Sequence, residues 1–520
     1  MKKTVELKLF PDQIGDEAFI WKRAASLAKV PLGDVTLVEV SRRSIDARGS
    51  RPVFRLRVHV WVDEMPENQP SQMADFKDVS KEKEVYIIGA GPAGYFAALR
   101  CIKEGIKPIV LDRGKDVQAR RRDLKAIQQH GVVNPHSNYC FGEGGAGTYS
   151  DGKLYTRSKK RGKIIGVLQM LVEHGAQEDI LLDAHPHIGS NKLPKIVAAL
   201  RETIEKYGGI VRFDSFVTDI EIQNQKICGL TINQTEIIQT DNIILATGHS
   251  ARDIYELLDA KSVYMEAKPF ALGVRIEHPQ SMIDEMQYNQ KVREENLPAS
   301  SYGVVAQIDA VGVFSFCMCP GGLIVPAATA PGEIVVNGMS LSRRDSPFAN
   351  SGFVTAVSVE ELAKHGYKGL FATMDFQKAV EQKLFAAGDG SQKAPAQRVM
   401  DFVNQKVSQE LNPTSYIPGI YSADMNALLP DVIARRLRKG IVEIDMKMKG
   451  YNTNEANIIG VESRTSSPIK IPRDRETYMH TEVKGLFPCG EGAGYAGGIL
   501  SACMDGENVA SAVKRWIIQY

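Results

Sequence analysis

Three stretches of this chain carry glycines at the spacing G-x-G-x-x-G, which lets a backbone turn approach a bound phosphate closely. They cover residues 89–94, 142–147 and 492–497. The first stretch alone has the full context: an apolar strand pattern at Val85–Ile88, a helix pattern, and a second strand pattern that ends at Asp112. Strand, glycine turn, helix, strand and acid in this order predict one dinucleotide-binding βαβ unit.

Each position of the first turn has a physical task in this prediction. Gly89 permits the tight turn, Gly91 lets the backbone approach a pyrophosphate, and Gly94 lets the helix pack closely on the strand. The helix N-terminus offers free N–H groups and partial positive charge to phosphates, and Asp112 is expected to accept from a ribose diol. Arg113 and Arg120 are candidates to neutralise the pyrophosphate, although the run 120–122 also fits a solvated helix face. The expected contacts of this half are Gly89, Gly91, Pro92, Ala93, Gly94, Asp112, Arg113 and Arg120.

The second glycine stretch belongs to FGEGGAGTYSDGKLYTR, residues 141–157, which also imitates a P-loop through Gly147, Gly152 and Lys153. Leu154 replaces the metal-binding Ser or Thr of a P-loop, and no apolar strand precedes the glycines. We expect this loop to lie against the cofactor, with Lys153 next to the reacting group; a surface lysine is the alternative. The loop residues expected at the cofactor are Gly144, Gly145, Thr148 and Ser150.

A few other side chains have reactive or charged groups. Cys317 and Cys319 lie two apart, so an extended chain points them to opposite faces, whereas a turn brings them together. A redox role for Cys317 therefore competes with simple packing. Arg275 interrupts an apolar strand pattern and needs a partner if it is buried; a solvated edge strand is the alternative. His185 and His187 lack the further ligands of a metal site, so no metal is expected.

Composition excludes several classes of function. The chain has 520 residues and a net charge of +2, so it has no overall attraction to nucleic acid or anionic membranes. It lacks a long apolar run that would span a membrane. Seven scattered cysteines do not indicate a disulfide framework, which favours the reducing cytoplasm.

Two later segments decide which dinucleotide is expected. DNIILATGHSARD runs from an apolar strand into an Ala-Thr-Gly turn, and KGLFPCGEGAGYAGGILSACMDGENVASAVKRW runs from a strand through a glycine loop into the last helix. Here the chain resembles the two-domain flavoproteins that include glutathione reductase and p-hydroxybenzoate hydroxylase. The resemblance implies FAD, with an acid on the ribitol and a helix N-terminus that stabilises the reduced flavin. It implies these contacts: Val217, Thr247, Gly248, Gly490, Glu491, Gly497, Gly498 and Ile499.

Further strings, among them FGEGGAGTYSDGKL, KPFALGVRIEHPQ, NGMSLSRRDSPFANSG and ESRTSSPI, are similar to a bacterial family of uncharacterised FAD-dependent dehydrogenases. The similarity covers nearly the whole chain. That family lacks the inserted NAD(P)H domain of glutathione reductase, so NADH or NADPH would dock only transiently as a donor.

We therefore expect an α/β fold with a Rossmann-like FAD-binding domain, an interleaved α+β substrate domain and a small N-terminal β-α-β-β module. The module covers 1–62 and is basic, and a linker covers 63–84. The FAD-binding domain takes 85–254, with an insertion near 156–182, and returns with the last strand and helix at 481–520. The substrate domain takes 255–480.

The expected function is an FAD-dependent oxidoreductase, a dehydrogenase or reductase, that moves hydride or electrons through non-covalent FAD to or from an unidentified small molecule. The expected catalytic residues are Lys153, Arg275 and Cys317. A flavin monooxygenase is one alternative. Another is an RNA-associated flavoprotein that grips phosphates with the six arginines between Arg42 and Arg57. The oligomeric state stays open.

Overall fold

The computed structural model describes residues 1–67, 70–155 and 164–519. The N-terminal module is a three-stranded antiparallel sheet in the order β1-β3-β2, with one long helix on it. Its elements are β1 (Lys2–Leu9), α1 (Glu17–Ala28), β2 (Val35–Asp46) and β3 (Val53–Val62). The order is the expected β-α-β-β. Phe54, Leu56, Val58 and Val60 alternate along β3 and are buried, because successive side chains point to opposite faces of a strand.

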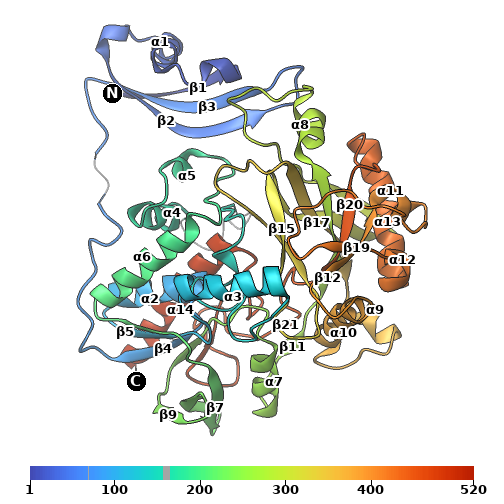
Figure 1. Ribbon diagram of the computed structural model, residues 1–520. Coiled ribbons are helices and arrows are strands. Elements are labelled where there is room, and N and C mark those ends of the chain that lie inside the picture. Colours follow the sequence, from blue (N-terminus) through green and yellow to red (C-terminus); the bar gives the residue numbers. More distant parts are fainter. Residues whose placement is uncertain (68–69, 156–163, 520) are drawn as a thin grey trace.

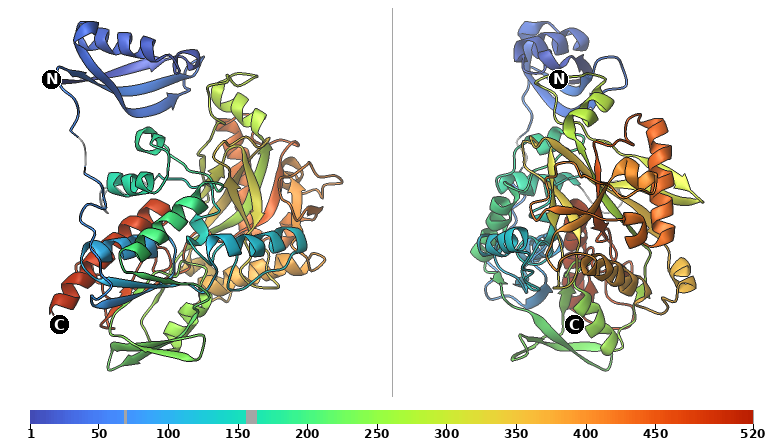
Figure 2. Two further views of the ribbon diagram at one scale, coloured as in Figure 1. Left: turned by 60° about the vertical axis from the view of Figure 1, so that its left-hand side comes forward. Right: turned by 45° about the vertical axis from the view of Figure 1, so that its right-hand side comes forward.

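The module rests on the remainder of the chain (Figure 2). Tyr288 and Leu297 join its hydrophobic core, and Arg43 pairs with Asp183 at 2.7 Å. Five of the six arginines between Arg42 and Arg57 have a carboxylate partner. Most of the charge proposed to grip RNA is therefore already neutralised within the chain.

A five-stranded parallel sheet follows, in the order β22-β10-β4-β5-β6. Its strands are β4 (Glu84–Ile88), β5 (Lys107–Leu111), β6 (Ile210–Arg212), β10 (Ile243–Leu245) and β22 (Leu486–Pro488). The last strand lies more than 200 residues after β10, so the chain leaves this sheet and returns to it. Apolar runs such as that of β4 fit a sheet that is covered on both faces.

Helices α2 (Pro92–Lys103) and α14 (Ile499–Gln519) pack on one face of this sheet, as Figure 1 shows. The other face is covered by α7 (Arg252–Ala260) and by a small antiparallel sheet. That sheet contains β7 (Val217–Gln223), β8 (Lys226–Ile232) and β9 (Glu236–Gln239). The remaining helices of this part are α3 (Val117–His130), α4 (Ile164–Glu173), α5 (Asp179–Leu182) and α6 (Leu193–Lys206). The insertion expected near 156–182 lies partly outside the described residues, and α4 and α5 occupy the rest.

The second large sheet has seven strands in the order β13-β14-β17-β12-β20-β18-β19. They are β12 (Phe270–Pro279), β13 (Val305–Ile308), β14 (Val311–Cys319), β17 (Phe348–Val357), β18 (Ala394–Arg398), β19 (Ile420–Ser422) and β20 (Asn457–Glu462). Neighbouring strands are antiparallel except β18 and β19. Two small ribbons flank the sheet: β15 (Gly322–Pro326) with β16 (Val336–Ser340), and β11 (Glu266–Ala267) with β21 (Ile469–Lys470).

Helix α13 (Asp431–Lys447) packs its apolar stripe, which includes Ile433, Leu437 and Ile441, into the core of this second sheet. Shorter helices complete the domain: α8 (Gln280–Tyr288), α9 (Val359–Lys364), α10 (Ala372–Ala386), α11 (Val399–Val403) and α12 (Met425–Leu428). No helix in 1–67, 70–155 or 164–519 is both long and apolar enough to cross a bilayer. The two large sheets have separate hydrophobic cores, and one cavity is lined by residues from both parts of the chain.

Candidate cofactor and reaction site

A cavity of about 380 Å³ lies at the carboxyl ends of β4, β5 and β10, the edge where open parallel sheets bind ligands. One wall is backbone from the turn after β4, the turn after β10 and the residues before α14. The facing wall comes from the second sheet and its neighbours and includes Phe316, Cys317, Asn337 and Thr465. Lys153 reaches the cavity from the loop between the two walls.

Glycines along the backbone wall show what the cavity is shaped for. A Cβ atom at Gly248, Gly497 or Gly498 would meet no protein atom within 4 Å, and all three residues line the cavity. The space beside them is therefore not needed for protein packing. Gly89 and Gly94 differ, because a Cβ there would lie 2.4 Å from the carbonyl oxygen of Ala246 and 1.9 Å from that of Gly89. The first three make room for a ligand, and the other two let the turn pack.

Asp112 lines the cavity and also shapes the turn above it. One carboxylate oxygen accepts from the backbone N–H of Ala90 at 2.8 Å, and the other accepts from Gly114 at 2.8 Å. A carboxylate has about four acceptor positions, so both oxygens keep capacity for ribose hydroxyls. The residue thus positions the glycine turn as well as facing the ligand.

Glu491, the acid expected at the ribitol, pairs with a histidine that sequence reasoning did not select. Nδ1 of His249 lies 3.1 Å from Oε2 of Glu491, and both residues line the cavity. Burial favours a raised pKa for Glu491, but the hydrogen bond and charge of His249 outweigh it and lower that pKa. His249 directly follows the Ala-Thr-Gly turn, and only this position in the sequence could have indicated that it lies at the cofactor site.

Gly490 does not face the cavity. Its N–H donates to Asp505 at 2.8 Å, and Arg473 binds the same carboxylate at 2.5 Å. A Cβ at Gly490 would approach that of Ala93 to 2.9 Å. Gly490 is therefore needed for packing between the last strand and α2, and it places Glu491 rather than touching a ligand.

Arg113 lines the cavity next to the position expected for adenine. Its guanidinium pairs with Asp253 at 2.6 Å and lies over the rings of Phe141 and Phe216, 4.6 and 4.4 Å from their centroids. Val217 lines the same end of the cavity. The cation is thus fixed in orientation at this end.

Arg120 requires a correction, because it neither lines the cavity nor lies on a solvated face. It is completely buried, and its guanidinium donates to five backbone carbonyls, those of Asn138, Tyr139, Gly142, Glu143 and Gly145. Burial lowers the pKa of this guanidinium. Arg120 therefore organises the glycine loop from inside, and it does not contact the pyrophosphate site.

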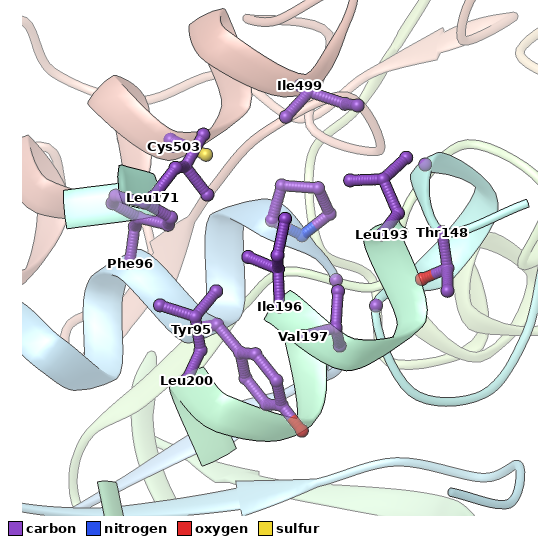
Figure 3. A pocket seen from close by; sticks show the side chains of 14 residues that line it. Tyr95, Phe96, Thr148, Leu171, Leu193, Ile196, Val197, Leu200, Ile499 and Cys503 are labelled. Carbon is purple, nitrogen blue, oxygen red and sulfur yellow. The ribbon is translucent and has the colours of Figure 1, made fainter. Parts of the chain in front are cut away.

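Gly144 and Thr148 also differ from expectation. Both line a separate apolar cavity of about 30 Å³ between α2, α4, α6 and α14 (Figure 3). The hydroxyl of Thr148 donates to the carbonyl of Glu143 at 3.0 Å, which closes the loop. Gly145 and Ser150 do face the large cavity. The loop thus contributes one side to the cofactor cavity and one to core packing.

Two cysteines and two charged groups meet on the side-chain wall. Nζ of Lys153 lies 4.0 Å from the sulfur of Cys317, 3.7 Å from that of Cys319 and 3.2 Å from a carboxylate oxygen of Asp151. Asp151 is buried and also pairs with Arg344 at 2.5 Å. Lys153 is therefore not a free surface lysine, and both sulfurs face the same cation.

A β-bulge in β14 explains why two cysteines at i and i+2 share one side. Pairing of β14 with β17 shifts between Phe316 and Cys319. Cys317 has φ of 46°, a left-handed conformation that is strained for a residue with a Cβ. The bulge breaks the alternation of a regular strand and turns both sulfurs toward Lys153.

Arg275 fixes this bulge but does not line the cavity. It is fully buried and pairs with Glu462 at 2.9 Å, so it has the partner that burial requires. Its guanidinium also donates to the carbonyl of Cys317 at 2.6 Å, and Nη2 lies 3.6 Å from the sulfur of Cys319. The expectation of a catalytic Arg275 is corrected to a positioning role.

Charge distribution makes Cys317 the more acidic thiol. A hydrogen bond from Cys319 lowers the pKa of Cys317 well below its usual range against the effect of burial, and the cations Lys153 and Arg275 add to this. The shared hydrogen bond and burial raise the pKa of Cys319. Burial tends to lower the pKa of Lys153, but the two sulfurs and Asp151 outweigh it and raise that pKa. The cluster thus favours a Cys317 thiolate beside an ammonium.

The structure brings most of the expected site residues to one cavity, and the glycine turns, the acids and the reactive wall meet there. Those that line it are Gly89, Gly91, Pro92, Ala93, Asp112, Arg113, Gly145, Ser150, Lys153, Val217, Thr247, Gly248, Cys317, Glu491, Gly497, Gly498 and Ile499. Those outside it are Gly94, Arg120, Gly144, Thr148, Arg275 and Gly490.

Comparisons with solved structures find chains of low sequence identity and low TM-score. A glycine oxidase from Bacillus cereus ATCC 14579 is 11% identical and covers 84% of this chain and 96% of its own, with a TM-score of 0.30. A glycine oxidase from Geobacillus kaustophilus is 12% identical and covers 83% and 95%, with a TM-score of 0.34. The flavin-dependent halogenase CmlS is 13% identical and covers 84% and 58%, with a TM-score of 0.34.

Sequence comparisons cover nearly the whole chain. Residues 269–465 match the family described as FAD-dependent protein, C-terminal domain-like, and residues 83–272 match pyridine nucleotide-disulphide oxidoreductase. Residues 1–61 match a domain of unknown function. An uncharacterised protein from Clostridium beijerinckii is 39% identical over 505 residues, which are 92% of each chain. Together with the geometry of the cavity, these matches show that the chain belongs to a family of FAD-dependent oxidoreductases.

Proposed function

We propose that this enzyme passes hydride or electrons between a non-covalently bound FAD and a small molecule that enters beside Lys153 and Cys317. The main support is that one cavity is lined on one side by glycine turns that leave space for a ligand and on the other by a cluster of reactive side chains. FAD supplies the hydride or electron chemistry when bound. The protein supplies orientation, charge and proton transfer.

The backbone wall would bind the cofactor along its length. The N-terminus of α2 would face the pyrophosphate with free N–H groups, and Asp112 would accept from the ribose next to it. Val217 would lie at the adenine, and Glu491, oriented by His249, would accept from the ribitol. The N-terminus of α14 would face the ring edge, where its partial positive charge favours the reduced flavin.

The side-chain wall would bind the reactant. The ammonium of Lys153 can donate to an anionic or carbonyl oxygen, and the adjacent Asp151 keeps it charged. Asn337 also lines the cavity. These groups would supply a proton donor and a nucleophile on the side of the cavity opposite the cofactor-binding turns.

NADH or NADPH is the proposed donor and would dock transiently, since the sequence contains one complete dinucleotide fingerprint. The test is anaerobic mixing of the purified holoprotein with NADH or NADPH while flavin absorbance is recorded, followed by addition of candidate acceptors. Bleaching by a nicotinamide and recovery with an organic acceptor supports the proposal. Recovery only with oxygen and a hydroxylated product would favour a monooxygenase, and protein without flavin would overturn both.

A further inference from the structure

The geometry points to a thiol–disulfide exchange site at Cys317 and Cys319, with a small disulfide as the substrate that reacts in this cavity. The inference deepens the proposed function, because it names a substrate class for the same chamber. The pair lies on β14 of the second sheet, outside residues 83–272, which match the disulphide oxidoreductase family. It is therefore a separate feature of this chain.

The positions of the two sulfurs suit an attacking and a resolving thiol. Cys317 is half-buried and lines the cavity, whereas Cys319 is fully buried behind it. Both sulfurs lie within 4.0 Å of Nζ of Lys153, and the Cys319 thiol donates to the backbone carbonyl of Cys317 at 3.3 Å. An incoming molecule would therefore meet Cys317 first, and the buried Cys319 would act as the resolving thiol.

The surrounding charges favour a nucleophile at the exposed position. The thiolate is the reactive form of cysteine, and neighbouring cations increase its fraction at neutral pH. Lys153, which pairs with Asp151 at 3.2 Å, supplies such a cation next to the cavity, and Arg275, which pairs with Glu462 at 2.9 Å, supplies a second one behind it. Arg275 still donates to the Cys317 carbonyl at 2.6 Å and so keeps the bulge that aligns the two sulfurs.

The reaction balances with the disulfide as the oxidant. The Cys317 thiolate attacks one sulfur of the substrate, a Cys317–substrate bond forms, and the second half of the substrate leaves as a thiolate. Cys319 then gives its proton to the thiolate that has left and attacks the sulfur of Cys317, and the substrate half bound to Cys317 leaves as a thiolate that takes up a proton from water. Two electrons pass from the protein dithiol to the substrate disulfide, which becomes two thiols.

The first experiment needs no substitution. Pre-reduced holoprotein, freed of reductant under anaerobic conditions, is mixed with hydroxyethyl disulfide and quenched with acid and an alkylating agent. Peptide mass spectrometry then locates the bond. A Cys317–Cys319 disulfide, with release of two equivalents of mercaptoethanol, is expected. Two thiols that both remain free to be alkylated would overturn the inference.

Three variants separate the two steps. In Cys319→Ser the mixed disulfide is expected to stay on Cys317, with one equivalent of mercaptoethanol released. In Cys317→Ser no adduct is expected on Cys319. Cys228→Ser, a half-buried cysteine on β8 outside the cavity, is the matched control and should behave as the wild type. An adduct on Cys319 in the second variant would contradict the assigned roles.

Lys153→Met tests the role of the cation by a pH profile. Loss of the ammonium should slow the first exchange step about threefold to tenfold near pH 7, because the smaller thiolate fraction is partly offset by higher intrinsic nucleophilicity. The difference should close near about pH 10, where an ordinary thiol is ionised. A pH-independent loss of rate would indicate a purely structural role and would count against Lys153 as the activating group.

The outcomes distinguish this inference from the proposed function. A holoprotein that is reduced by a nicotinamide but forms no Cys317–Cys319 disulfide would overturn the exchange site and leave the proposed function intact. A protein that forms the disulfide but contains no flavin and binds none would overturn the proposed function and leave the exchange site intact.

Discussion

The wall of the cavity beneath the dinucleotide turn is formed mainly by backbone, whereas the facing wall is formed by side chains. Gly248, Gly497 and Gly498 open the first wall by having no Cβ. Lys153 and Cys317 define the second by charge and by a strained bulge. The backbone wall selects its ligand by shape, whereas charges set the reactivity of the side chains on the facing wall. Steric changes should therefore disable the first, and changes of charge or pH should disable the second.

The largest expected effect comes from Arg120, which supports the backbone wall from inside. Arg120→Met would leave five buried carbonyls without their donor, and each unpaired buried acceptor costs about 1–3 kcal/mol. Partial relaxation leaves an expected loss of about 3 kcal/mol or more in the free energy of unfolding, measured by urea denaturation. The exposed Arg122, two residues along the same helix, is the matched control, and Arg122→Ala should change stability by about 0.5 kcal/mol or less. Equal effects of the two variants would refute the internal role.

A steric change in the backbone wall should affect cofactor binding without affecting folding. Gly497→Val adds a side chain whose Cβ atom would meet no protein atom within 4 Å, at a position that lines the cavity. We expect FAD affinity to fall about a hundredfold, equivalent to about 2.7 kcal/mol, while thermal stability of the apoprotein stays unchanged. Gly303, which also has open space but lies outside the cavity, serves as the control in Gly303→Val. Unchanged FAD binding in Gly497→Val, measured by calorimetry, would remove Gly497 from the site.

The side-chain wall should instead respond to pH. Lys153 and Arg344 lower the pKa of buried Asp151 below its ordinary value of 3.8, against the effect of burial. A lowered folded-state pKa adds stability above pH 3.8, and this stability is lost as the pH falls further. The free energy of unfolding of the wild type should exceed that of Asp151→Asn by about 1–3 kcal/mol near pH 7. This difference in stability should shrink near about pH 3. A gap independent of pH would contradict the ion-pair account.

The smallest expected effect concerns His249, which orients an acid on the backbone wall. His249→Ala should weaken FAD binding about threefold to tenfold, because Glu491 loses one hydrogen bond. In a Glu491→Gln background, His249→Ala should weaken FAD binding by less than it does in the wild type, because the two residues act as a pair. If the two substitutions have strictly additive effects on the binding free energy, so that their factors in the dissociation constant multiply, the two residues act separately.

The same contrast explains which features the sequence could predict. Gly89, Gly94 and Asp112 act within one short βαβ segment, so their spacing alone indicates their tasks. Arg120 lies on a helix whose pattern does not show that its side chain turns inward to the loop 138–145. The pairing of Cys317 with Lys153 depends on a bulge and on contacts between residues more than 160 positions apart. No local pattern encodes such a contact, and His249 was missed because its partner Glu491 lies 242 residues later.

The central claim is that both walls enclose one reaction chamber, so that bound flavin faces Cys317. The most direct measurement is the visible absorption spectrum of the purified holoprotein, compared with those of Cys317→Ser and Cys228→Ser. We predict that all three contain FAD and that only Cys317→Ser shifts the flavin band, because it removes a thiolate from the facing wall. Superimposable spectra of wild type and Cys317→Ser, at a pH where Cys317 is ionised, would contradict the account.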